Sequence, residues 1–94
     1  MKIPTKLKIL GHDYTVELVD SESIQKDCGE QNRARNTIKI RNDIPDSQKE
    51  ETLIHEILHA INSGIDEKEV EFLAVTIYCV LKENNLLNEL HRII

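Results

Sequence analysis

The chain has 94 residues, a net charge of −5 and 39% hydrophobic residues, which fits one small domain (1–94) with a modest core. It has no apolar run long enough to cross a bilayer and no signal-peptide pattern, so we expect no membrane partner. The acidic balance and the low aromatic content (3%) disfavour direct nucleic-acid binding. The two cysteines, Cys28 and Cys79, lack metal-type spacing, which favours free thiols in a reducing cytoplasm.

Three short segments of the first half alternate polar and apolar residues, as half-buried strands do. Lys6–Leu10 and Tyr14–Val19 are separated by residues that favour a turn, so together they predict a β-hairpin. Thr37–Arg41 predicts a third strand. We expect this third strand to lie at the sheet edge, where an extended peptide can pair with it or where its charged side chains protect the edge from aggregation.

The segment between the hairpin and the third strand is harder to assign. Asp20 to Arg35 is polar and charged and shows no repeating period. This pattern predicts a loop, with a short strand near Ile24 or Cys28 as the alternative.

Two helices are predicted in the second half, from about Ser47 to Ser63 and from about Asp66 to Glu83. The apolar stripe of the second helix comprises Val70, Leu73, Ala74, Ile77, Val80 and Leu81. Additional apolar residues on another side of this helix are Phe72, Val75 and Cys79. We expect them to be covered by a homodimer or by the apolar C-terminal tail. The tail carries Leu86, Leu87, Leu90, Ile93 and Ile94.

The first of these helices contains the motif H-E-x-x-H, formed by His55, Glu56 and His59. Residues four apart lie one turn apart on one helix face, so two such imidazoles can bind one Zn²⁺. A glutamate directly after the first histidine can reach a water on that metal, which is the position of the general base in a zinc hydrolase. The alternative is that both histidines are ordinary surface residues.

A catalytic zinc takes three protein ligands in most proteins, so a third is expected from elsewhere in the chain. The second helix offers Glu67 and Glu71, one turn apart on one face. Glu71 is favoured because it lies a full turn inside the helix with the small Ala74 three residues later. Glu67 lies nearer the core stripe, but its place in the first turn is also explained by the helix dipole.

The run from Glu51 to Ile61, followed by Glu69–Ala74, resembles small phage and prophage metallopeptidase-like proteins. These are similar to the ImmA/IrrE group and to minimal gluzincins, in which a second helix supplies a glutamate ligand. The resemblance implies zinc ligands His55, His59 and Glu71, with Glu56 as catalytic base. The family motif E-x-x-A matches Glu71 to Ala74.

We therefore expect an α+β, minimal zincin-like fold: about three antiparallel strands packed on the H-E-x-x-H helix and a second ligand-bearing helix. The expected function is zinc-dependent hydrolysis of a protein or peptide through a zinc-bound water, with Glu56 as general base. The alternative is a non-catalytic, metal-binding interaction module with the same fold. Tyr78, His91 and His12 are candidate donors to the oxyanion, although Tyr78 is better explained as a half-buried core tyrosine.

Overall fold

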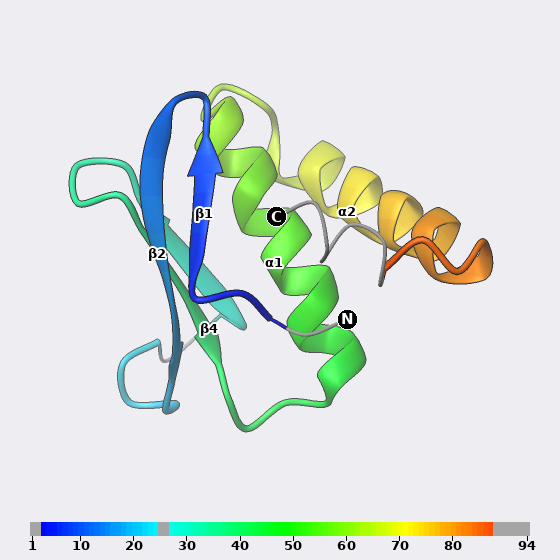
Figure 1. The fold of residues 1–94 in the computed structure, drawn as a ribbon, viewed down its shortest axis with the longest axis horizontal. Helices are drawn as coiled ribbons and strands as arrows, with labels where there is room; N and C mark the ends of the chain where they lie inside the picture. The colour runs from blue at the N-terminus through cyan, green and yellow to red at the C-terminus, as the bar shows by residue number, and fades with distance from the viewer. Residues whose placement is uncertain (1–2, 25–26, 88–94) are drawn as a thin grey trace.

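The computed structural model describes residues 3–24 and 27–87. The elements are β1 (Lys6–Ile9), β2 (His12–Val19), β3 (Gly29–Asn32), β4 (Thr37–Arg41), α1 (Asp46–Ile61) and α2 (Glu67–Glu83). All strands precede both helices along the chain, and one mixed sheet packs against the helical layer (Figure 1). The predicted α+β class is therefore confirmed. Within the described residues, neither helix is long and apolar enough to span a membrane.

The four strands have the order β1-β2-β4-β3. β1 pairs antiparallel with β2, and β3 pairs antiparallel with β4. The central pair is parallel, with Val16 of β2 opposite Ile38 of β4. The prediction of about three antiparallel strands was therefore wrong in the number of strands and in the direction of the central pair.

β3 explains both errors. Its sequence, Gly29–Asn32, has no apolar alternation, so pattern alone does not distinguish it from a loop. The chain leaves β2 at Val19, forms β3 at the far edge of the sheet, and returns through β4 in the same direction as β2. Thr37–Arg41 is consequently an interior strand, and the prediction that it lies at the edge was wrong.

The β1–β2 hairpin is tighter than the sequence suggested. Ile9 pairs with His12, which leaves Leu10 and Gly11 as the two turn residues, with φ of 49° and 84°. Two consecutive positive φ angles are typical of a type I′ turn, whose twist matches that of the flanking strands. The second strand therefore begins at His12 and not at Tyr14.

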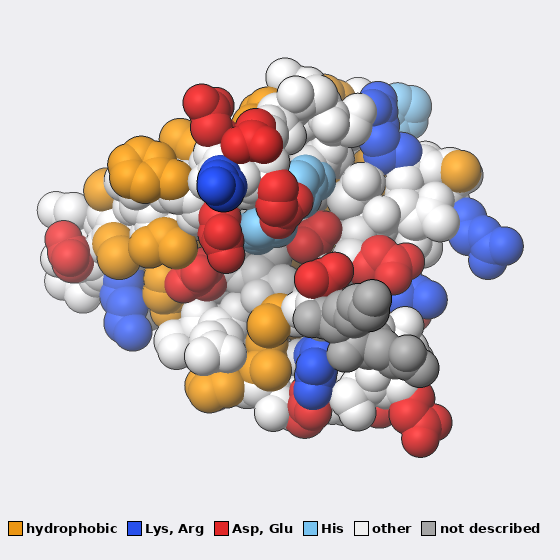
Figure 2. Space-filling view, turned by 180° about the vertical axis from the view of Figure 1, so that it is seen from behind, with side chains coloured by type: hydrophobic (Ala, Val, Ile, Leu, Met, Phe, Trp, Pro, Cys, Tyr) orange, Lys and Arg blue, Asp and Glu red, His pale blue; other side chains and the backbone are white. Residues whose placement is uncertain are grey.

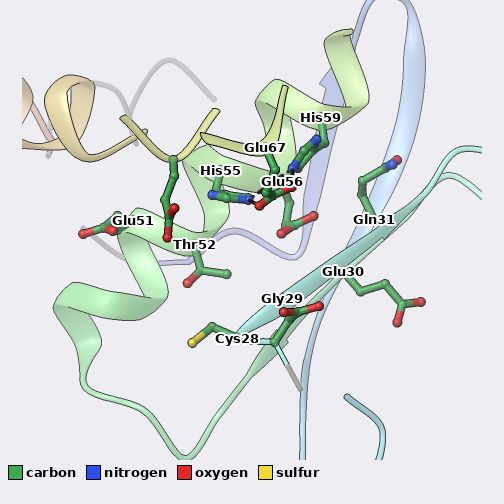
Figure 3. Close-up of a pocket in the computed structure, with 12 residues that line it drawn as sticks. Cys28, Gly29, Glu30, Gln31, Glu51, Thr52, His55, Glu56, His59 and Glu67 are labelled. Carbon is green, nitrogen blue, oxygen red and sulfur yellow. Dashed lines mark hydrogen bonds and ion pairs between the residues drawn. The ribbon is translucent and has the colours of Figure 1, made fainter. Parts of the chain in front are cut away.

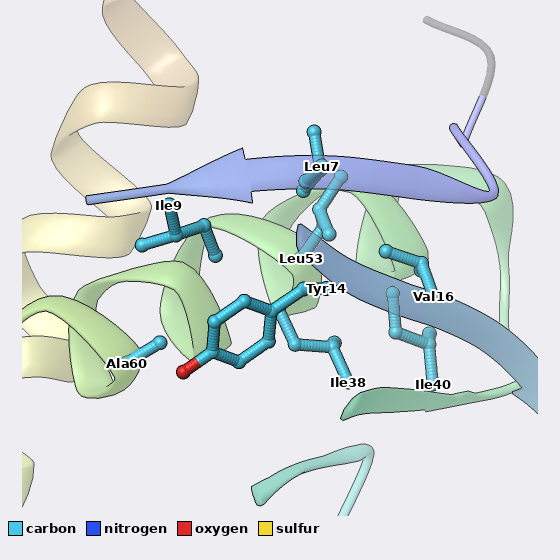
Figure 4. Packing of buried hydrophobic residues seen from close by; sticks show 8 residues of the cluster. All are labelled: Leu7, Ile9, Tyr14, Val16, Ile38, Ile40, Leu53 and Ala60. Atoms are coloured by element: carbon cyan, nitrogen blue, oxygen red, sulfur yellow. The ribbon is translucent and has the colours of Figure 1, made fainter. Parts of the chain in front are cut away.

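One face of the sheet packs on α1 to form the core (Figure 4). Ile38 and Ile40, on the interior strand β4, are fully buried. The cluster consists of Leu7, Ile9, Tyr14, Val16, Ile38, Ile40, Leu53 and Ala60. α2 packs on another side of α1, so α1 lies between the sheet and α2 (Figure 1). Both helix boundaries agree with the prediction to within two residues.

α2 buries a narrower stripe than the sequence pattern indicated. Its buried residues are Val70, Ala74 and Tyr78, one per turn. The apolar residues of α2 that remain exposed are Phe72, Leu73, Val75, Ile77 and Val80, together with Cys79. Apolar side chains accordingly gather over this part of the surface (Figure 2).

The C-terminal tail, which was predicted to cover this surface, lies only partly within the described residues. In the tail, Leu86 is exposed and Leu87 is buried, whereas Leu90, Ile93 and Ile94 lie outside the described residues. A homodimer through α2 stays a prediction.

Candidate metal centre

Three side chains meet where α1 and the first turn of α2 come together (Figure 3). His55 and His59 lie one turn apart on α1, and their Nε2 atoms are 3.2 Å apart. The Glu67 carboxylate spans both, with Oε1 2.8 Å from Nε2 of His55 and Oε2 2.8 Å from Nε2 of His59. In the part of the chain that the structure describes, this is the only group of three His, Cys, Asp or Glu residues arranged to hold a metal ion.

The spacing of these atoms fits a small divalent cation. Ligands about 2.05 Å from a tetrahedral Zn²⁺ are about 3.3 Å from one another, and the two imidazole nitrogens are 3.2 Å apart. If no metal is bound, the Glu67 carboxylate accepts a hydrogen bond from the Nε2–H group of each ring. These two N–H groups then lie side by side, and their parallel dipoles repel each other. A cation removes that repulsion because it replaces both protons.

Of the two glutamates considered as third ligand, the structure brings Glu67 to the histidines. Glu71 lines the same pocket but is not among the three groups whose ligand atoms lie within 4.8 Å of one another. The geometry therefore favours Glu67 over Glu71 as the third ligand, and the identity of that ligand stays a prediction. The physical reason is the short connection between the helices, which places the first turn of α2, and not its second, beside His59.

If Glu67 is the third ligand, two isosteric changes should have different effects on zinc affinity. Glu67→Gln should weaken zinc binding at least about tenfold, because an amide oxygen is a poorer ligand than a carboxylate. Glu71→Gln should change the affinity only about twofold, through the loss of one nearby charge. Competition with a chromophoric chelator measures both affinities. The opposite order of effects would restore Glu71 as the ligand.

Glu56 lies on the side of α1 that faces β3, and its side chain is only 7% exposed. It has no hydrogen-bond or ion-pair partner among the described residues. Burial, together with the neighbouring carboxylates of Glu67, Asp27 and Glu30, raises the pKa of Glu56 to about 7. A carboxyl group with a pKa near 7 suits proton transfer at neutral pH, and a bound cation would favour its ionised form.

The three groups open into a pocket of about 710 Å³ between α1, α2 and β3. Gly29 allows β3 to come close enough to form one wall. A Cβ atom at this position would lie 2.5 Å from Cγ2 of Thr52 and 3.1 Å from Cγ of Glu56. A larger residue here would therefore have to displace the Thr52 side chain or move the strand away from α1.

The contribution of β3 to the site could not be predicted from the sequence pattern. Glu30 and Gln31 line the pocket, yet they belong to a polar segment that was assigned as loop. The alternative of a short strand near Cys28 was the one signal that pointed to this wall.

Of the three candidate oxyanion donors, the two that the structure describes, Tyr78 and His12, are not brought to the metal ligands. Tyr78 is buried, and its hydroxyl donates to Oε1 of Glu50 at 2.7 Å. Burial raises the pKa of Tyr78 to about 12, with the hydrogen bond to Glu50 as the second cause, so Tyr78 is a core residue. His12 is exposed at the start of β2 and does not line this pocket, and His91 lies outside the described residues.

Comparisons of this chain with protein-family models, curated proteins and solved structures give no match.

Proposed function

We propose that this protein is a zinc-dependent metallopeptidase of zincin-like fold. The observation that supports it best is the meeting of His55, His59 and Glu67 beside a buried carboxylate, Glu56, that has no hydrogen-bond or ion-pair partner in residues 3–24 and 27–87. A purely structural metal site does not need that fourth group. The resemblance of residues 51–61 to small phage metallopeptidase-like proteins supports the same function. The free thiols of Cys28 and Cys79 are consistent with a cytoplasmic protein.

His55, His59 and Glu67 would hold the zinc, which when bound supplies a Lewis acid that polarises a carbonyl and activates water. Glu56 would accept a proton from the attacking water at its carboxylate and donate it to the nitrogen of the leaving amine. Its burial keeps bulk water from competing for this proton and holds the carboxylate beside the ligands.

The edge strand β3 is the favoured place for an extended substrate. On one side it pairs with β4, and its residues Gly29, Glu30 and Gln31 line the pocket. Pairing of a peptide with this edge would carry its backbone past the metal ligands. The side-chain Oε1 of Gln31 is buried without a hydrogen-bond partner among the described atoms, so it offers an acceptor to a substrate N–H after a small rotation.

The proposed activity is tested by reconstitution. The metal-free protein, given one equivalent of zinc, should cleave an unfolded protein substrate such as reduced casein, and the products are identified by mass spectrometry. A chelator should stop cleavage, and further zinc should restore it. Absence of cleavage by protein that has bound zinc would contradict the proposal.

One observation favours the alternative, a non-catalytic interaction module. The exposed apolar residues of α2, above all Phe72 with 69% exposure and Val80 with 50%, are typical of a surface that another protein covers. This surface is separate from the pocket-lining residues. A binding role there is compatible with catalysis, and the Glu56→Gln variant described below separates the two functions.

A further inference from the structure

The pocket is lined by many acidic groups. Six of its twelve lining residues are Asp or Glu and none is Lys or Arg. The six are Asp27, Glu30, Glu51, Glu56, Glu67 and Glu71. Figure 2 shows the acidic side chains gathered around the histidines in the hollow of this face. The pocket therefore carries a concentrated negative potential that attracts cations.

Glu56 provides independent evidence that the pocket accepts a ligand. It is more than nine-tenths buried, it borders the pocket, and it has no ion-pair or hydrogen-bond partner among the described residues. Buried carboxylates in folded proteins are normally paired. The missing partner is therefore expected from outside the chain.

The remaining acidic groups flank the metal ligands on two sides. Glu51 lies one turn before His55 on α1, and Glu71 lies one turn after Glu67 on α2, so both border the helical side of the pocket. Asp27 and Glu30 line the pocket on the side of β3. The two charges of a bound Zn²⁺ would offset two of the six carboxylates, which leaves the four flanking groups uncompensated.

We propose that this pocket selects peptides with Lys or Arg side chains beside the bond to be cleaved, and that Glu51 and Glu71 determine this selectivity. The inference rests on the proposed peptidase function. The long, flexible side chains of Lys and Arg can reach carboxylates on the pocket wall while the peptide backbone lies along β3. Acidic peptides are repelled from the same pocket.

Binding is measured separately from cleavage, in the Glu56→Gln background loaded with zinc, where a bound peptide stays intact. Three fluorescent decapeptides differ only at two positions, which hold Lys, Gln or Glu. We expect the Lys peptide to bind roughly tenfold tighter than the Gln peptide, with the difference shrinking as salt increases. Adding Glu51→Gln and Glu71→Gln should remove the larger part of the preference, while Asp27 and Glu30 keep their charge.

The matched control carries Glu69→Gln and Glu83→Gln, two exposed residues of α2 that do not line the pocket. It has the same net charge as the Glu51/Glu71 variant and should retain the preference. Equal loss in both variants, or no preference in the parent, would overturn the inference. Wild-type cleavage of all three peptides at equal rates would overturn it and leave the peptidase function standing. Preferential binding without any cleavage by the wild type would contradict the peptidase function alone.

Discussion

Replacing Glu56 with Gln should lower the rate of peptide hydrolysis about 10²- to 10⁴-fold while zinc stays bound. This is the usual contribution of a positioned general base. Gln has the same size and can hydrogen-bond, but it cannot accept the proton of the attacking water. The zinc ligands His55, His59 and Glu67 are unchanged, so the metal content should stay near that of the wild type.

The measurement combines turnover with metal analysis on the same preparation. Glu69→Gln, an exposed change on α2, is the control for loss of one negative charge. Retained hydrolysis in Glu56→Gln would assign the base elsewhere. A parallel loss of zinc would show that Glu56 holds the metal site together and is not specific to the chemistry.

The same variant should also change the pH dependence of stability of the metal-free protein. The pKa of Glu56 rises from its ordinary 4.5 to about 7 on folding, so between these pH values the folded state holds a proton that the unfolded state has lost. Stability therefore falls as pH rises from 4.5 to 7. Gln removes this penalty, and urea unfolding above pH 7 should show a gain of about 1–3 kcal/mol, with none near pH 4.

The second large effect is expected from His59→Ala, which should reduce bound zinc from about one per chain to almost none. One histidine and one carboxylate would remain as ligands. The zinc affinity should fall more than about a hundredfold, because the loss of a hydrogen-bond partner of a ligand already costs about 10- to 100-fold and the loss of the ligand itself costs more. Zinc at a hundred times its Kd should stabilise the wild type by about 2.7 kcal/mol. The same concentration should leave the melting temperature of the variant unchanged.

His12→Ala is the control, because His12 is exposed on β2 and does not line the pocket. It should bind zinc as the wild type does. Full zinc occupancy in His59→Ala would mean that the cluster is an ordinary hydrogen-bonded group and that the metal binds at another place. The proposed peptidase function would then be wrong.

The alternating strands and the amphipathic helices could be predicted from the sequence because each pattern records which face is buried. β1, β2 and β4 were found this way. Strand direction is not recorded in alternation, since a strand buries the same residues whether its neighbour is parallel or antiparallel. The parallel pairing of β2 with β4 was missed for this reason.

The site shows the same division between local and non-local information. His55 and His59 could be paired from their spacing, because one helix fixes their relative position. The choice between Glu67 and Glu71 depends on how α2 approaches α1, which neither helix encodes alone. The burial of Glu56 was also not predictable, because it arises from the close approach of Gly29 on a strand that the pattern did not reveal.

All three candidate ligands and the adjacent carboxylate fall within residues 55–67, on two helices joined by a short connection. The contacts among these residues close a shorter loop than the β2–β4 pairing, in which Thr15 lies opposite Thr37. The helical hairpin alone therefore contains every candidate ligand. The wall formed by β3 depends on a separate contact of longer range, because Gly29 meets Thr52 and Glu56 of α1, so the ligand cluster and the wall of the pocket are specified by different parts of the chain.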